Sequence, residues 1–354
     1  MTIGPPGKAP VGVDLFCGAG GVTCGMRKAG VEVRLGIDSD PRFTRTYEVN
    51  NAPAKYWARD MTTVSGREIL KAIAPEDSQK FILSACPPCQ PFSRQNKRGV
   101  HRGHRDERSD LLDEVRRLLR EIPRKPDYLF VENVPGISKS PDSALKRFED
   151  FLYEQKYTAV SAIVDAADYG VPQHRKRFIL LAKLGISFVS LPKPTHGDGK
   201  MFDYNTVEVI REYPPVAAGE KCDDPPNHQA RQLSEVNLNR IREIPRDGGS
   251  RRDLPGKLIL ECHKKSYGHH DVYGRLAWQK PAPTITTKCV SLSNGRFGHP
   301  DQDRALTVRE AARLQTFPND YRFFGTGIDS EAKQVGNAVP VLLAEVFTRH
   351  LLSL

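Results

Sequence analysis

The sequence predicts an α/β protein built on a doubly wound, mostly parallel β-sheet, with a second, smaller and irregular domain. In the first part of the chain, apolar runs of strand length alternate with stretches of helical periodicity. Strands that alternate with helices form βαβ units, which build a parallel sheet covered by helices on both faces. The expected strands lie at 11–16, 31–37, 81–85, 128–131 and 177–182.

Helical periodicity is clearest at residues 110–121, where leucines recur with arginines between them. A helix ending at Ala29 is also expected after the first strand. From about residue 191 prolines interrupt a polar stretch that has no long helical pattern, and residues 307–315 and 339–350 are again typical of helices. The sequence therefore predicts a first domain at 1–190, a smaller irregular domain at 191–290, and a returning segment at 291–354.

The net charge, the length of the apolar runs and the cysteine spacing indicate which classes of protein are compatible with this sequence. Lys and Arg outnumber Asp and Glu by 53 to 43, and this net charge of +10 favours a polyanionic partner such as nucleic acid. A basic enzyme without such a partner would have the same balance. No apolar run approaches the roughly 20 residues of a membrane span, and no secretory signal is evident. The seven cysteines are unevenly spaced, so we expect a cytoplasmic protein without a disulfide scaffold.

A glycine-rich turn, DLFCGAGG at 14–21, ends the first strand and opens a helix. Gly18 and Gly20 allow close approach of a ligand to the backbone, and a helix N-terminus offers N–H donors. The third glycine of the dinucleotide fingerprint would fall at Thr23, so that fingerprint is incomplete. Asp38 ends the second strand, where an acid commonly binds a ribose. This order of elements favours a nucleoside ligand over a solvated turn.

A Cys-x-x-Cys pair, Cys86 and Cys89, follows the third strand within CPPCQPFS. It is compatible with a redox disulfide, half of a zinc site, or a nucleophile in a stiff loop. Zinc needs further ligands and no second such pair exists, so no metal site is expected. Redox pairs usually open a helix, whereas the prolines here fix an extended loop that suits a nucleophile.

Two further segments carry polar side chains at strand ends. Glu132 follows four apolar residues, where a buried carboxylate needs a partner or a task. QHRKR at 173–177 precedes the last strand, and either a solvated turn or a binding site is possible there. Ligands of open α/β sheets bind beyond the carboxyl ends of strands, so these segments and the basic, glycine-containing loop 94–108 are expected near one site.

Together the motifs resemble those of the DNA (cytosine-5) methyltransferases of bacterial modification systems, in the family's order and over nearly the whole chain outside the second domain. Ser39 departs from the family pattern, because many members carry a bulky residue there that packs on the adenine. The resemblance implies the fold of S-adenosylmethionine-dependent methyltransferases. The matching segments are DLFCGAGG at 14–21, GIDSDP at 36–41, RDMT at 59–62, PPCQPFS at 87–93, ENV at 132–134, QHRKR at 173–177, RALTVREAARLQTFP at 304–318 and QVGNAVP at 334–340.

The resemblance also implies roles for single residues. Cys89 would attack carbon 6 of a flipped-out cytosine, Glu132 would hold ring nitrogen 3, and Arg177 would bind the carbonyl oxygen with support from Arg175. S-adenosyl-L-methionine is the implied cofactor. Its expected binding residues are Phe16, Gly18, Gly20, Asp38, Asp60 and Asn337.

The second domain would then recognise the DNA sequence, with double-stranded DNA as the partner of a monomeric enzyme. PAPTITTK at 281–288 resembles the end of such a domain. A restriction endonuclease acting on the same site is a further expected partner. The residues expected to contact DNA are Ser93, Arg94, Lys97, Arg98, Arg251, Arg252, Lys264, Arg275 and Arg296.

Three other functions compete with this interpretation. A tRNA cytosine methyltransferase would use the same fold, but the sizeable recognition domain favours DNA. A non-catalytic nucleic-acid-binding protein is disfavoured by the presence of Cys89, Glu132 and Arg177. A nucleotide-dependent oxidoreductase using the cysteine pair is disfavoured by the missing third glycine.

Overall fold

The computed structural model describes residues 8–88, 111–139, 144–185, 188–260 and 271–354. Within them, seven strands form one sheet in the order β3-β2-β1-β4-β5-β7-β6. The first five strands pair in parallel, whereas β7 is antiparallel to β5 and β6, so the predicted mostly parallel sheet is confirmed. The strands are β1 (Val11–Leu15), β2 (Glu32–Asp38), β3 (Lys55–Ala58), β4 (Phe81–Ala85), β5 (Tyr128–Asn133), β6 (Tyr157–Asp165) and β7 (Lys176–Leu184).

The strand order reverses beside β1. The chain places β2 and β3 on one side of β1, and then β4 and β5 on the other. The carboxyl ends of strands at such a switch point are where doubly wound sheets bind their ligands. The glycine-rich turn after β1 and the cysteine segment after β4 both begin there.

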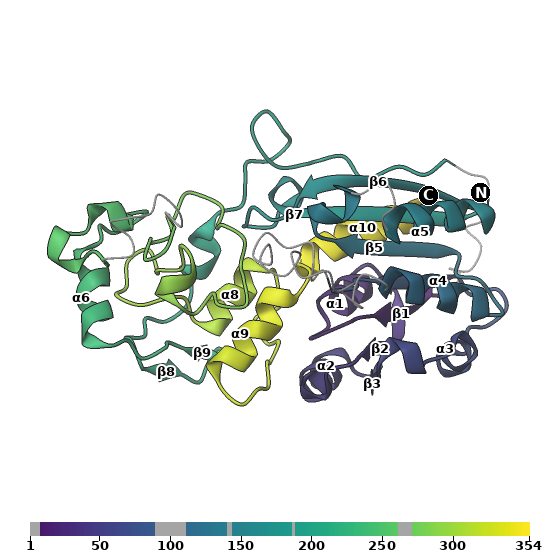
Figure 1. Cartoon of the computed structure of the whole chain (residues 1–354), viewed down its shortest axis with the longest axis horizontal. Coiled ribbons are helices and arrows are strands. Elements are labelled where there is room, and N and C mark those ends of the chain that lie inside the picture. The colour runs from purple at the N-terminus through teal and green to yellow at the C-terminus, as the bar shows by residue number, and fades with distance from the viewer. Residues whose placement is uncertain (1–7, 89–110, 140–143, 186–187, 261–270) are drawn as a thin grey trace, which may run out of the picture. The chain divides into compact units, whose positions relative to one another are not determined.

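Helices cover both faces of the sheet (Figure 1). Alternate residues of β1, namely Val11, Val13 and Leu15, belong to a core cluster with residues of α3, α4 and α5. Gly12 faces the opposite side, where an added Cβ would come within 2.8 Å of Met26 in α1. The helices that contribute to the first unit are α1 (Gly21–Lys28), α2 (Thr44–Asn51), α3 (Gly66–Ile73), α4 (Leu111–Glu121), α5 (Ala144–Glu154) and α10 (Val341–Ser353).

The chain divides into two compact units whose limits differ from the predicted domain boundaries. The first unit is Met1–Asp165, Lys176–Lys193 and Leu343–Leu354, and the second is Ala166–Arg175 with Pro194–Leu342. Residues 291–342 thus group with the second unit rather than with the sheet. Contacts explain this grouping, because Gln173 donates a hydrogen bond to the carbonyl oxygen of Leu314, 3.1 Å away.

The second unit contains little regular structure. Its buried interior includes the ion pair of Arg304 with Glu310, whose two bonds measure 2.8 and 2.7 Å, and both side chains are almost fully buried. Gly336 packs directly on the backbone of Thr286 and Thr287, since an added Cβ would overlap it. The described elements are β8 (Lys221–Cys222), β9 (His228–Gln229), α6 (Glu235–Glu243), α8 (Val308–Leu314) and α9 (Ile328–Asn337), together with short 3-10 turns.

All five expected strands are present, with ends that shift by a few residues, and helices are found near 110–121, 307–315 and 339–350. The sequence patterns did not reveal β3 and β6. β3 has only four residues and β6 is an edge strand, so neither shows a long apolar run. Among the described residues, none of the helices combines the length and the apolar character that a membrane span requires.

We expect Gly36→Ala to lower the free energy of unfolding by about 1–3 kcal/mol, because the new methyl group would overlap the buried ring of Tyr47. Gly256→Ala is the matched control, since no atom lies within 4 Å of its added Cβ. Urea unfolding of both variants followed by fluorescence tests this. Equal urea midpoints of unfolding for the two variants would show that the ring of Tyr47 moves to make room for the methyl group without a loss of stability.

Candidate active site

The glycine-rich turn after β1 bends back onto the end of β2. Gly18 and Gly20 have φ values of 50° and 90°, a left-handed conformation that glycine adopts without strain. The backbone N–H of Gly18 donates a hydrogen bond to Oδ2 of Asp38 at 3.0 Å, and the N–H of Asp40 donates to its Oδ1 at 2.9 Å. Burial raises the pKa of Asp38. The structure therefore brings the predicted loop and the predicted ribose-binding acid together.

Open space lies beside this loop. A Cβ added at Gly18 would meet no atom within 4 Å, and the carboxylate of Asp38 is only partly buried. Phe16, with φ of 60°, packs partly exposed against the core cluster at the start of the same turn. Asp60 is exposed, and its Oδ1 accepts hydrogen bonds from the backbone and hydroxyl of Thr62 at 2.9 and 2.7 Å. These features fit a nucleoside ligand that contacts a glycine turn and a carboxylate.

Asp14 lies beneath this turn and is fully buried. Its Oδ2 accepts a hydrogen bond from the hydroxyl of Thr23 at 2.7 Å, and its Oδ1 accepts one from Ser84 at 2.6 Å. Burial raises the pKa of Asp14 to about 6, although both hydroxyl groups oppose that rise. Burial also raises the pKa of the nearby Cys17 thiol, so Cys17 is not suited to act as a nucleophile.

The segment that leads to Cys89 is held by β5. Nδ2 of Asn133 donates a hydrogen bond to the carbonyl oxygen of Pro87 at 3.2 Å, and its Oδ1 accepts one from the backbone of Val134 at 2.9 Å. Cys86 continues the strand pairing, with its N–H donating to Leu15 at 3.3 Å. The predicted nucleophile Cys89 lies outside the described residues, as do the DNA-contact candidates Ser93, Arg94, Lys97, Arg98 and Lys264.

Glu132 and Arg177 meet at the same edge of the sheet. Nε of Arg177 lies 2.8 Å from Oε1 of Glu132, and Glu132 is only 8% exposed. The antiparallel pairing of β7 with β5 explains this contact, because it brings the start of β7 to the carboxyl end of β5. The buried carboxylate thus has its partner, as the sequence required.

Arg175 and Asn337 belong to the second unit. The guanidinium of Arg175 is buried and donates to the carbonyl oxygens of Ile285, Gly336 and Ala338 at 2.7, 3.0 and 3.1 Å. It therefore joins three segments of that unit. Asn337 is exposed at the end of α9.

The remaining arginine candidates differ in exposure. Arg275 is 0% exposed and donates five hydrogen bonds within the second unit, so its guanidinium group binds the protein itself. Arg296 is half-buried, and its guanidinium group donates hydrogen bonds to three backbone carbonyl groups of the second unit. Arg251 is buried, and Arg252 is exposed.

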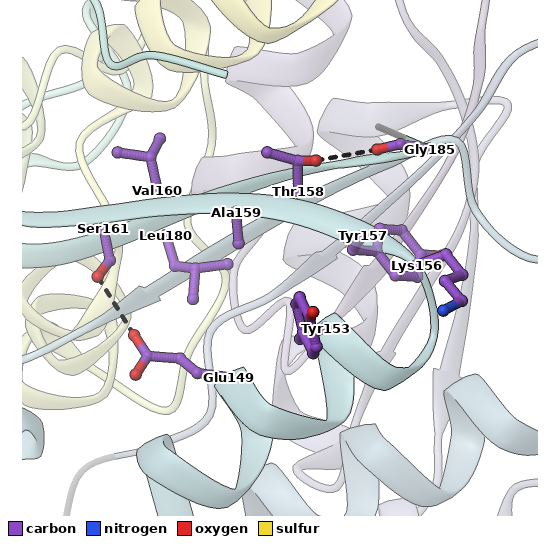
Figure 2. Close-up of a pocket in the computed structure, with 10 residues that line it drawn as sticks. All are labelled: Glu149, Tyr153, Lys156, Tyr157, Thr158, Ala159, Val160, Ser161, Leu180 and Gly185. Atoms are coloured by element: carbon purple, nitrogen blue, oxygen red, sulfur yellow. Dashed lines mark hydrogen bonds between the residues drawn. The ribbon is translucent and has the colours of Figure 1, made fainter. Parts of the chain in front are cut away.

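A groove of about 550 Å³ lies elsewhere, between α5 and the strands β6 and β7 (Figure 2). Tyr153, Tyr157 and Leu180 line it, and Ser161 donates a hydrogen bond to Glu149 at 3.3 Å within it. None of the predicted site residues lines this groove. It is therefore separate from the residues grouped at the carboxyl ends of β1, β2, β4 and β5.

Comparison with known proteins decides the family. The family model of C-5 cytosine-specific DNA methylases matches residues 11–353. The chain belongs to the C-5 cytosine-specific DNA methylase family. This DNA methylase is a DNA (cytosine-5) methyltransferase.

Individual relatives agree with this assignment. Type II methylase M.HgiDII of Herpetosiphon aurantiacus is 40% identical over 348 residues, which cover 96% of this chain and 94% of the relative. Type II methyltransferase M1.HphI of Haemophilus parahaemolyticus is 32% identical over 348 residues, covering 97% and 86%. The solved structure of a prophage-encoded Escherichia coli protein matches with a TM-score of 0.69 at 23% identity, covering 98% of this chain and 99% of that one, and so supports the fold.

Two residues of the DNA methylase lie in the motifs ENV and QHRKR, but the sequence predicted no role for either of them. Asn133 holds the segment before Cys89, and Gln173 is fully buried with its amide bonded to Leu314, Gln315 and Ile285. The sequence did contain a signal for both residues, since each is a polar residue next to an apolar strand. A polar side chain in such a position needs a hydrogen-bonding partner.

The pKa of Asp14 predicts a pH-dependent difference in stability between the wild type and the variant Asp14→Asn. When the pH is lowered from 8 to 5, we expect the free energy of unfolding of the wild type to rise by about 1 kcal/mol relative to that of the variant. The folded-state pKa of about 6 exceeds the ordinary value of 3.8, so the folded protein takes up the proton first as the pH falls. Burial of the charged form destabilises the wild type only at the higher pH. Urea unfolding of both proteins at each pH measures the difference, and a constant difference would contradict it.

Proposed function

We propose that this protein transfers the methyl group of S-adenosylmethionine to carbon 5 of a cytosine flipped out of double-stranded DNA, through a covalent Cys89 adduct at carbon 6. The observation that carries the proposal is the pair of Glu132 and Arg177, 2.8 Å apart at the strand end beside the stem of the cysteine segment. Ring nitrogen 3 and the carbonyl oxygen are neighbouring atoms on one edge of cytosine. An adjacent carboxyl and guanidinium group can bind both atoms together.

Cys89, Glu132 and Arg177 would each carry out a different step of the reaction. The thiolate of Cys89 adds to carbon 6, and Glu132 gives a proton to ring nitrogen 3, so negative charge does not accumulate on the ring. Arg177 holds the carbonyl oxygen throughout. Once carbon 5 carries the methyl group, loss of its proton to solvent water would form the carbon 5–carbon 6 double bond and release Cys89 as a thiolate, and the nitrogen 3 proton would return to Glu132. Asn133 fixes the backbone two residues before the nucleophile and so limits its position.

The residues after β1 and β2 fit the cofactor. S-adenosylmethionine, when bound, supplies an activated methyl group. Asp38 would accept hydrogen bonds from the ribose hydroxyl groups, with Asp60 at the adenine and Asn337 as a further contact. Phe16, Gly18 and Gly20 would form the wall of the site, where the space beside Gly18 is open.

The target cytosine must flip out of the DNA duplex, because a thiol cannot reach carbon 6 of a base that is stacked inside the duplex. We assign sequence recognition to residues 191–290, in which exposed Arg252 is the candidate for a phosphate or base contact. The basic segment 94–108, which includes Arg94, Lys97 and Arg98, would contact the phosphate backbone.

The names of the relatives support a place in a Type II modification system. We infer a monomeric cytoplasmic enzyme, because one flipped base needs one catalytic site. Its partner by class would be a restriction endonuclease that cleaves the same site when it is unmethylated.

Methyl transfer from labelled S-adenosylmethionine tests the proposal. Unmethylated genomic DNA and tRNA are offered separately, and the DNA product is sequenced after bisulfite treatment. We expect 5-methylcytosine in one short, recurring sequence context. Label in tRNA alone would establish an RNA methyltransferase instead, and label in neither would favour a binding protein.

We expect Cys89→Ser to lose methyl transfer by at least about a thousandfold while DNA affinity stays within about threefold, because the nucleophile is needed for chemistry and not for binding. Cys86→Ser is the matched control and should retain activity. Filter assays of methyl transfer and gel-shift titrations measure both. Loss of activity in both variants would indicate a paired-cysteine mechanism, and full activity of Cys89→Ser would exclude the nucleophile.

We expect Asp38→Ala to raise the S-adenosylmethionine KM by about tenfold or more with little change in DNA affinity, since the carboxylate would bind the ribose. Asp40→Ala serves as the comparison, because its carboxylate pairs instead with exposed Arg42. Initial rates at varied cofactor concentration give the KM values. A parallel loss of DNA binding in Asp38→Ala would mean that Asp38 supports the fold.

A further inference from the structure

The helix that opens after the glycine turn lacks the usual cap at its start. Gly20 occupies the N-cap position of α1 with φ of 90°, no N-cap side chain accepts a hydrogen bond, and the first turn contains no acidic residue. Ser, Thr, Asp or Asn at this position would normally accept a backbone N–H of the first turn. Glycine supplies the turn that the loop needs, so the first turn of α1 needs its anchor from elsewhere.

That anchor is a carboxylate from the adjacent strand. Asp14 in β1 accepts hydrogen bonds from both the backbone N–H and the hydroxyl of Thr23, the third residue of α1. The hydroxyl contact measures 2.7 Å, and both side chains are completely buried. A negative charge at the start of a helix also interacts favourably with the helix dipole. Asp14 thus caps α1 from the sheet.

The hydrogen bonds extend to both sides of this contact. Tyr47 in α2 lies 3.0 Å from the hydroxyl of Thr23, and since the proton of Thr23 goes to Asp14, the phenol donates. The missing side chain of Gly36 gives the Tyr47 ring its space. On the other side, Ser84 in β4 donates to the second oxygen of Asp14 at 2.6 Å. The carboxylate of Asp14 therefore accepts hydrogen bonds from two hydroxyl groups. Only the hydroxyl group of Thr23 belongs to the helix that follows the glycine turn.

We infer that Asp14 and Thr23 are positioning residues that hold the first turn of α1, and with it the glycine turn, in the geometry that binds the cofactor. The inference rests on the proposed use of S-adenosylmethionine. β1 and β4 are already joined by their parallel backbone ladder, so the bond to Ser84 adds stability without placing the loop. The bond to Thr23 fixes the helix onto the strand. Breaking these two bonds should have different effects on cofactor binding.

The test compares Thr23→Val and Ser84→Ala, which each remove one hydroxyl group from the carboxylate of Asp14, with Thr23→Ser, which keeps the hydroxyl group. S-adenosylmethionine is titrated calorimetrically into the full-length wild type, Thr23→Val, Thr23→Ser and Ser84→Ala, and the DNA affinity of each is measured separately. We expect Thr23→Val to raise the cofactor Kd by about tenfold, and Thr23→Ser and Ser84→Ala to stay within about threefold. DNA affinity should be unchanged in all four proteins. Thermal melting reports the stability of each variant.

The outcomes separate the two proposals. A wild type that does not bind S-adenosylmethionine would overturn the proposed function. A wild type that binds it, together with a folded Thr23→Val that binds equally well, would overturn the positioning role, and so would an equal loss in Ser84→Ala. If Thr23→Val does not fold, Thr23→Ala takes its place, because alanine also removes the hydroxyl group that donates to Asp14. An unchanged cofactor Kd in a folded Thr23→Ala would likewise overturn the role.

Discussion

The parallel pairing of β1 with β2 on one side and β4 on the other is the constraint on which the site depends. Leu15 pairs with Ile37 of β2 and with Ala85 of β4, so the three strands end at the same level. The turn after each strand then starts from the same edge. The glycine turn, Asp38 and the cysteine segment are neighbours for this reason, although up to about seventy residues separate them in the chain.

A reversal of strand direction completes the arrangement. If β7 ran parallel to β5, the QHRKR segment before it would lie at the opposite edge of the sheet. The antiparallel register places Phe178 beside Asn133, so Arg177 reaches Glu132. The cost of burying the Glu132 carboxylate is offset by this arginine, and the two side chains lie together at one strand end. Strand direction therefore has a chemical consequence here.

The second unit uses arginine in another way. With strands of only two residues, its backbone carbonyl groups have few ladder partners. Arg175, Arg275 and Arg309 are buried, and each donates to three or more backbone carbonyl oxygens. A guanidinium group offers five donors, so one side chain can join several irregular segments. Part of the excess positive charge thus stabilises the fold and is not available to bind DNA.

The class of fold, the order of the motifs and the positions of Asp38 and Glu132 at strand ends could be predicted from the sequence, because strand length, glycine turns and polar groups at strand ends are local signals. The sequence did not determine which arginines are buried: Arg275 and Arg252 look alike in the sequence, but only the three-dimensional packing encloses the first. Nor did it indicate that Asn133 holds Pro87 or that Asp14 caps α1. Those contacts join residues from different strands and helices, and only the tertiary structure brings their donors and acceptors within hydrogen-bonding distance.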